Sequence, residues 1–225
     1  MAVRNIQELV DAQVGLWEKE RLASKGKQEG PTVSIHRQPS SGATVIGEKV
    51  SELLGFGFFD KAIVEEIAKE ENIRSSLVEN LDEHFRTAIE RHVLSGFSSK
   101  SFSESDYLKD LVHVISHVGH RGNAVIVGRG SAFILPKETT LRVLLTAPIE
   151  NRVQWHAEKT GIDTADVQKI LEMEEKSRME FLKQDFGIEA VRPEDFDICI
   201  NTATFGIEGA ADLIADAARK RFAIN

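Results

Sequence analysis

The sequence predicts an α/β fold built on a mostly parallel sheet, and two observations lead to that prediction. Short apolar runs recur along the chain, as in strands that are buried on both faces. These runs lie at residues 33–35, 57–60, 123–129, 141–147 and 196–201. Segments with apolar residues at helical spacing separate most of them. This alternation is typical of a sheet whose parallel strands are joined by helices.

The helices are predicted from their apolar faces and their end signals. The helix that follows the first strand, at residues 43–54, carries Ile46 and Val50 on its apolar face and stops at Gly55. Further helices are expected at residues 61–71, 75–94, 106–120, 148–160, 164–183 and 206–222, and a polar loop at 96–105. Cys199 lies between two isoleucines of the last strand, which predicts a buried and inert thiol.

Bulk composition argues against several classes of protein. The net charge of -8 argues against a protein that coats a nucleic-acid polymer, so no such partner is expected. No apolar run approaches the ~18 residues of a membrane span, and the N-terminus lacks the apolar segment of a secretory signal. The single cysteine excludes an internal disulfide and a multi-cysteine metal site. We therefore expect a cytoplasmic protein without a membrane partner.

Residues 1–30 are predicted to form an amphipathic helix and a linker ahead of one domain that spans residues 31–225. Two roles stay open for this N-terminal extension. Its helix packs on its own domain, or it contacts a second copy of the chain in a homodimer. Trp17 would anchor such an interface, because aromatic residues are enriched at interfaces.

The turn between the first strand and the first helix has the physical design of a phosphate-binding loop. Its backbone N–H groups would surround an anion at a helix N-terminus, which carries partial positive charge. The residues concerned are Ser40, Ser41, Gly42, Ala43 and Thr44. Against the pattern G-x-x-x-x-G-K-[ST], Gly42 and Thr44 fit, but Arg37 occupies the first glycine slot and Ala43 the lysine slot. The alternative is an ordinary strand-to-helix turn.

Polar residues end four of the predicted strands and should meet in one crevice, because ligands of parallel sheets bind at the carboxyl ends of the strands. These residues are Arg37, Asp60, Arg129 and Asn201. Three of them have a structural alternative. Arg37 and Asp60 could form a salt bridge, while Asp60 and Asn201 could each cap the helix that follows.

Several segments, in this order, resemble the cytidylate kinase-like family of P-loop proteins, which is related to the nucleoside monophosphate kinases. They are IHRQPSSGATVIGEKVSELLGFGFFDK, GNAVIVGRGSAFIL, LRVLLTAPIENRV, EEKSRMEF and FDICINTATFGIEGAADLI. The resemblance runs from about Val33 almost to the C-terminus. It implies a P-loop kinase-like three-layer fold with a five-stranded sheet flanked by helices, a substrate-binding insert at 61–105 and a helical lid at 151–192. It also implies ATP and Mg²⁺ as cofactors and small-molecule nucleotides as substrates.

The resemblance also implies roles for single residues. Arg37 would supply the charge of the absent lysine, and Arg129 would bind the acceptor phosphate, with Asp60 beside it. Arg152 and Arg178 would close onto the transferring phosphoryl group from the lid, although Arg178 could instead pair with Glu174 or Glu175. The residues after the last strand, Asn201 and Thr202, would lie near the donor base. Thr44 and Asp60 would be the candidates for Mg²⁺.

Three functions are weighed. The first is an ATP-dependent kinase that acts on a nucleoside monophosphate or a similar small acceptor. The second is a catalytically impaired nucleotide sensor or scaffold, suggested by Ser40 and Ala43 at positions where the family usually has glycine. The third is a kinase for a non-nucleotide acceptor, because Gly130 stands where cytidylate kinases usually have aspartate.

Overall fold

The computed structural model describes residues 30–69 and 106–224 of the 225-residue chain. The predicted N-terminal helix with its dimer interface, the predicted helix at 75–94 and most of the 61–105 insert lie outside the described residues. None of the helices in these described ranges has the length and apolarity needed to cross a lipid bilayer.

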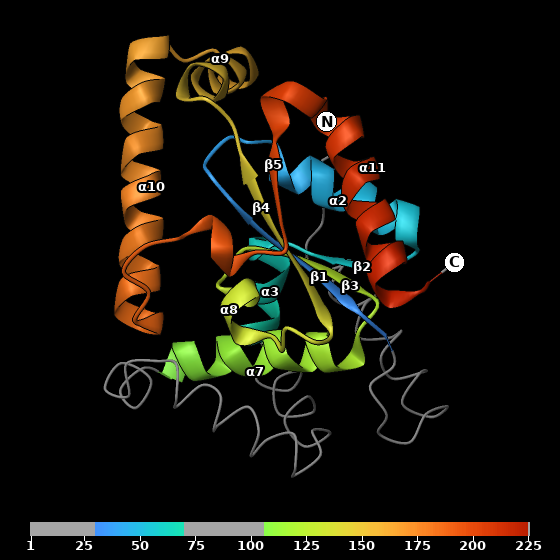
Figure 1. The fold of residues 1–225 in the computed structure, drawn as a ribbon. Coiled ribbons are helices and arrows are strands. Elements are labelled where there is room, and N and C mark those ends of the chain that lie inside the picture. Colours follow the sequence, from blue (N-terminus) through green and yellow to red (C-terminus); the bar gives the residue numbers. More distant parts are fainter. Residues whose placement is uncertain (1–29, 70–105, 225) are drawn as a thin grey trace.

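A single sheet of five strands forms the centre of the described domain, and every neighbouring pair of strands runs parallel (Figure 1). The strands are β1 (Thr32–Arg37), β2 (Gly57–Phe59), β3 (Ala124–Val127), β4 (Thr140–Thr146) and β5 (Ile198–Asn201), in the order β2-β3-β1-β4-β5. β1 is central, because Ile35 pairs with Val127 on one side and with Val143 on the other. The predicted α/β fold with a parallel sheet is therefore confirmed.

Helices cover both faces of the sheet and make three layers (Figure 1). α2 (Ala43–Leu54) and α11 (Thr202–Phe222) share one core with the sheet, while α3 (Lys61–Lys69), α7 (Asp106–Arg121) and the short α8 (Ser131–Ile134) share the other. β3 shows why its apolar run is continuous. Val125 and Val127 pack in the first core, and Ala124 and Ile126 pack in the second.

Two further helices occupy the region predicted as the lid. α9 (Ile149–Thr160) follows the carboxyl end of β4, and α10 (Thr164–Phe186) runs back along the side of the domain (Figure 1). Gly161, with φ of 74°, ends α9, and the Asp163 side chain caps α10 by accepting from the Ala165 N–H. Leu182 and Phe186 anchor the far end of α10 in the core with α3 and α7.

Two predictions about the C-terminal part of the chain need correction. A 3-10 turn (Pro193–Asp195) leads into β5, which is an edge strand, so only its β4 side is paired and Cys199 is exposed rather than buried. α11 begins at Thr202 rather than at Gly206. Gly206 instead interrupts it with non-helical angles of φ 68° and ψ -175°.

Candidate active site

Residues 38–42, here called the 38–42 loop, connect β1 to α2. Ser40 and Gly42 both have left-handed backbone angles, with φ of 58° and 82°. A Cβ at Gly42 would lie 2.5 Å from a side-chain carbon of Ile207, so close packing as well as φ favours glycine there. The buried Ser41 hydroxyl donates to the Gln38 carbonyl at 2.9 Å. No side chain caps the first turn of α2, which leaves its N–H groups suited to an anion.

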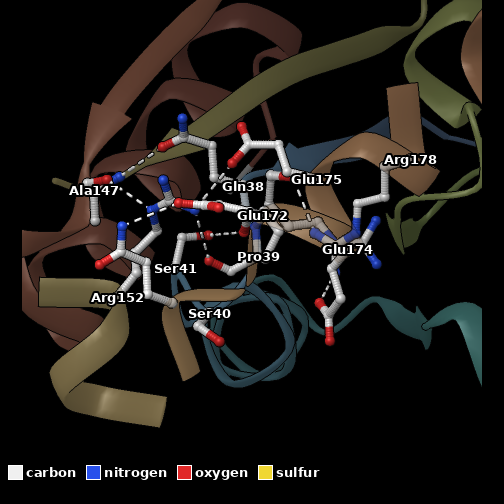
Figure 2. Close-up of polar contacts among 12 residues, drawn as sticks. Gln38, Pro39, Ser40, Ser41, Ala147, Arg152, Glu172, Glu174, Glu175 and Arg178 are labelled. Atoms are coloured by element: carbon white, nitrogen blue, oxygen red, sulfur yellow. Dashed lines mark hydrogen bonds and ion pairs between the residues drawn. The ribbon is translucent and has the colours of Figure 1, made fainter. Parts of the chain in front are cut away.

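The β4–α9 segment holds this loop from outside (Figure 2). The Ala147 N–H donates to Gln38 Oε1 at 3.1 Å, and Arg152 Nη1 donates to the Pro39 carbonyl at 3.4 Å. Ser40 Oγ lies 2.9 Å from His156 Nδ1, at hydrogen-bond distance. The loop and the predicted lid are thus in direct contact.

Arg152 is engaged by acceptors of the protein itself. Besides Pro39, it donates through Nε to the Ala147 carbonyl at 3.0 Å and pairs with Glu175 of α10 at 3.2 Å. Its exposed fraction is only 5%. The side chain therefore ties the loop, the start of α9 and α10 together.

A cavity of about 420 Å³ opens beside the carboxyl ends of β1 and β3, and we call it the arginine cavity. Three of the four predicted arginines line it, namely Arg37 from β1, Arg129 after β3 and Arg178 from α10. Its other lining residues are His36, Lys61, Gly130, Glu174, Ser177, Phe181 and Leu182. Side chains that are far apart in sequence thus meet in one positively charged space.

Within the described part of the chain the Arg37 side chain makes no ion pair or hydrogen bond, so the alternative salt bridge to Asp60 is not formed. The carboxylates of Asp60 and Glu174 still act on its charge from a greater distance. Burial, followed by the charges of Arg178 and Arg129, lowers the pKa of its guanidinium to about 10. A Cβ at Gly128 would lie 1.8 Å from Arg37 Nη1, so glycine leaves the space that this guanidinium occupies.

Arg129 sits in a turn in which three consecutive residues have left-handed angles. Gly128, Arg129 and Gly130 have φ of 87°, 52° and 71°. The Arg129 guanidinium pairs with Glu65 of α3 and lies 5.5 Å from the centre of the Phe181 ring. Its Nε is buried without a partner among the described residues. The turn thus aims a partly satisfied arginine into the cavity.

Arg178 contacts both a backbone carbonyl of β1 and a carboxylate of its own helix. Its Nη1 donates to the Arg37 carbonyl at 3.3 Å, and its Nη2 pairs with Glu174, one turn earlier in α10, at 3.3 Å. The alternative pairing with Glu174 is therefore present. About a third of the side chain (34%) remains exposed toward solvent. Burial is the largest effect that lowers the pKa of this guanidinium.

Sequence reasoning did not assign a role to His36, Lys61 or Phe181 in this cavity. His36 packs in a triangle of rings, 6.1 Å from that of Phe133 and 5.6 Å from that of Phe196, which are 6.0 Å from each other. Burial and the charges of Arg37 and Arg178 lower its pKa to about 4, so the imidazole is neutral at pH 7. Of these three residues, only Lys61 had a sequence signal for a place in the cavity, because it directly follows Asp60 at the end of a predicted strand.

Asp60 and Asn201 act as helix caps. Asp60 Oδ1 accepts from the N–H groups of Ala62 and Ile63 at 2.9 and 3.0 Å. Asn201 Oδ1 accepts from the Ala203 N–H at 3.0 Å. The capping alternatives are therefore present, and the predicted roles of these residues toward ligands stay predictions.

Thr202 and Thr44, the other predicted ligand contacts, differ in exposure. The buried Thr202 hydroxyl donates to the Thr146 carbonyl at 3.2 Å. Thr44 is exposed on the first turn of α2. Within residues 30–69 and 106–224, no cluster of three or more His, Cys, Asp or Glu side chains could hold a metal ion by itself.

Comparisons with known proteins identify the family. A model of the cytidylate kinase-like family matches residues 32–204. The cytidylate kinase of Ignicoccus hospitalis is 26% identical over 183 residues, which cover 81% of this chain and 95% of that protein. That of Methanopyrus kandleri is 23% identical over 195 residues, which cover 80% and 91%.

One solved structure supports the fold. An uncharacterized protein from Eubacterium ventriosum superposes with a TM-score of 0.67 at 18% identity, covering 86% of this chain and 99% of that one. The architecture is the P-loop kinase-like three-layer fold that the sequence predicted. Because the family model spans well over half of the residues, this chain belongs to the cytidylate kinase-like family.

Proposed function

We propose that this protein is a kinase that transfers a phosphoryl group from ATP to a nucleoside monophosphate or a similar small phosphorylated acceptor. The observation that carries the proposal is the arginine cavity, in which the Arg37 side chain makes no ion pair with the described residues and lies beside Arg129 and Arg178. Phosphoryl transfer needs phosphates held in line and their charge neutralised, and it needs little covalent chemistry from the protein. Family membership supports a phosphotransferase, and an ATP-dependent enzyme of this kind would work in the cytoplasm.

The donor phosphates would bind at the 38–42 loop. The uncapped first turn of α2 offers N–H groups from Ala43 and Thr44 next to the left-handed Gly42. Mg²⁺ usually takes one or two protein oxygens and completes its shell with phosphates and water. The exposed hydroxyl of Thr44 fits that need, with the free oxygen of Asp60 as the other candidate. The bound Mg²⁺ would neutralise phosphate charge.

The acceptor phosphate would bind in the arginine cavity. Arg37, which the resemblance casts as the substitute for the absent lysine, lines this cavity, and we assign it to the acceptor phosphate instead. It would meet that phosphate first, because its guanidinium makes no ion pair with a carboxylate of the described chain. Arg129, with its buried unpartnered Nε, and Arg178, one third exposed, would complete the anion site. Arginine suits this task because it can bind phosphate through two parallel hydrogen bonds.

A coupled ADP-release assay with CMP, dCMP, UMP, AMP and GMP as acceptors tests the proposal. Turnover with at least one acceptor is expected. Arg37→Ala should lower turnover about 100- to 1,000-fold, which is typical for the loss of one donor to a transition-state oxyanion. Arg219→Ala is the control, because this arginine contacts Leu53 at the other end of α2. Absence of turnover with every acceptor, despite measurable ATP binding, would refute the kinase.

The second candidate is a nucleotide-binding sensor or scaffold without phosphoryl transfer. Ala43 in the lysine slot favours it, because the loop then lacks the side chain that usually reaches the donor phosphates. This candidate predicts that ATP raises the melting temperature while no ADP forms. A kinase with a non-nucleotide acceptor remains as a variant of the first candidate, because Gly130 stands where cytidylate kinases usually have aspartate. At Gly130 a Cβ would lie 2.7 Å from the Phe186 ring, so a side chain at this position would collide with the ring.

A further inference from the structure

We propose that α9 holds the 38–42 loop in its phosphate-binding shape through two positioning residues, Arg152 and His156. We call these contacts between α9 and the loop the clamp. The proposal rests on the proposed function in one respect, namely that ATP is the ligand of the loop. The resemblance implies that Arg152 contacts the transferring phosphoryl group, whereas here Arg152 holds the loop. His156, to which the sequence assigned no role, holds the loop with it.

The clamp consists of hydrogen bonds to three consecutive loop residues. Arg152 and His156 are four positions apart and therefore share a face of α9. That face meets the loop at the Pro39 carbonyl and at the Ser40 hydroxyl. The Ala147 N–H, just before α9, binds the side chain of Gln38. Figure 2 shows the Arg152 side chain reaching across to the loop.

The backbone of Ser40 points to a role for its hydroxyl. With φ of 58°, Ser40 has a left-handed conformation that glycine adopts without steric cost. A serine in this conformation is strained but supplies the oxygen that lies 2.9 Å from His156 Nδ1. Glycine would relieve the strain and lose the contact with α9. The contact with His156 therefore accounts for a serine at a position whose backbone favours glycine.

Arg152 is unsuited to a direct contact with substrate in this arrangement. The residue is only 5% exposed, and its guanidinium donates to Ala147, Pro39 and Glu175. Arg178, by contrast, is one third exposed and lines the arginine cavity. The two arginines predicted for the lid thus divide the work. Arg178 faces the substrate site, and Arg152 connects the donor loop to α10 through Glu175.

A double-mutant cycle tests the clamp in the full chain. The variants are Ser40→Ala, His156→Phe and the double variant, and the probe is a non-hydrolysable ATP analogue with Mg²⁺ in isothermal titration. Each single variant should weaken binding about tenfold, and the double variant should be no weaker than either single one, because both remove the same contact. Gln154→Ala on α9, whose side chain bonds to Glu158 of the same helix, is the control and should bind like wild type.

Additive losses in the cycle, or single variants that bind like wild type, would overturn the proposal. Hydrogen exchange of the 38–42 backbone without ligand is the second measurement, and it does not depend on ATP binding. Ser40→Ala and His156→Phe should both speed exchange in the loop, while Gln154→Ala should not. Unchanged exchange overturns the clamp even if ATP does not bind. If wild type binds ATP but shows no turnover, the proposed kinase function is refuted while the clamp is not.

Discussion

The imidazole of His36, packed against the rings of Phe133 and Phe196, predicts a loss of stability in mild acid. Burial, together with Arg37 and Arg178, lowers its pKa from 6.5 to about 4 in the folded protein. Between these two pH values the unfolded chain binds a proton that the folded chain does not. The free energy of unfolding must therefore fall as the pH drops through this window, and it must be unaffected by this group above about pH 7.

The size of the effect follows from the pKa difference. One unit corresponds to about 1.4 kcal/mol, so the full displacement of His36 corresponds to about 3 kcal/mol between pH 7.5 and pH 4. That is a large part of the ~5–15 kcal/mol by which domains are usually stable. The change should also be reversible on return to neutral pH, because only protonation is involved.

Urea unfolding of wild type and His36→Leu at half-unit steps from pH 4 to pH 8 measures this contribution. Wild type should lose about 3 kcal/mol more than the variant on acidification, since the difference between the two cancels the titration of shared carboxylates. His36→Gln provides a second uncharged side chain in case leucine disturbs the packing against Phe133 and Phe196. Parallel stability curves for wild type and both variants would refute the reasoning.

Three more predictions concern single sites. Gly128→Ala should lower turnover as Arg37→Ala does, because its Cβ would occupy the place of the Arg37 guanidinium at a φ of 87°, and steady-state kinetics check this. Gly130→Ala should cost about 1–3 kcal/mol in a denaturant titration, because its Cβ would press on the buried Phe186 ring. Cys199 should react with an aromatic disulfide reagent in the native protein. Partial desolvation of this exposed thiol, followed by the charge of Glu194, raises its pKa above the ordinary value, so the rate should be slower than for a free thiol at pH 7 and should rise with pH.

The fold was predictable because its signals are local. Continuous apolar runs located the strands to within a few residues, and Gly55 and Gly161 mark the helix ends that the structure has. Position in the sheet is a tertiary property and was not predictable. Cys199 lies in a strand that looks buried by pattern, yet β5 lies at the edge and exposes it.

For the site, the sequence predicted which strand ends come together but not which side chains pair there. The rule that strand ends share one crevice placed four residues together, and two of them, Arg37 and Arg129, line the arginine cavity. The other two, Asp60 and Asn201, are not among its lining residues. It could not show which charges are already paired, because the partners depend on packing between distant elements. Glu65 of α3 pairs with Arg129, while the Arg37 side chain makes no ion pair or hydrogen bond in the described chain. Likewise, the contact of His156 with the loop depends on how α9 folds back over it.

The most direct test of the kinase is to follow the phosphorus atoms themselves. ³¹P NMR of the protein with ATP, Mg²⁺ and each nucleoside monophosphate distinguishes transfer from hydrolysis, which ADP release alone does not. The account predicts that ADP and the diphosphate of the acceptor appear in equal amounts in wild type, or two ADP for each ATP when AMP is the acceptor, and far more slowly in Arg37→Ala. ATP that persists with every acceptor, or ADP that appears with free phosphate alone, would contradict it.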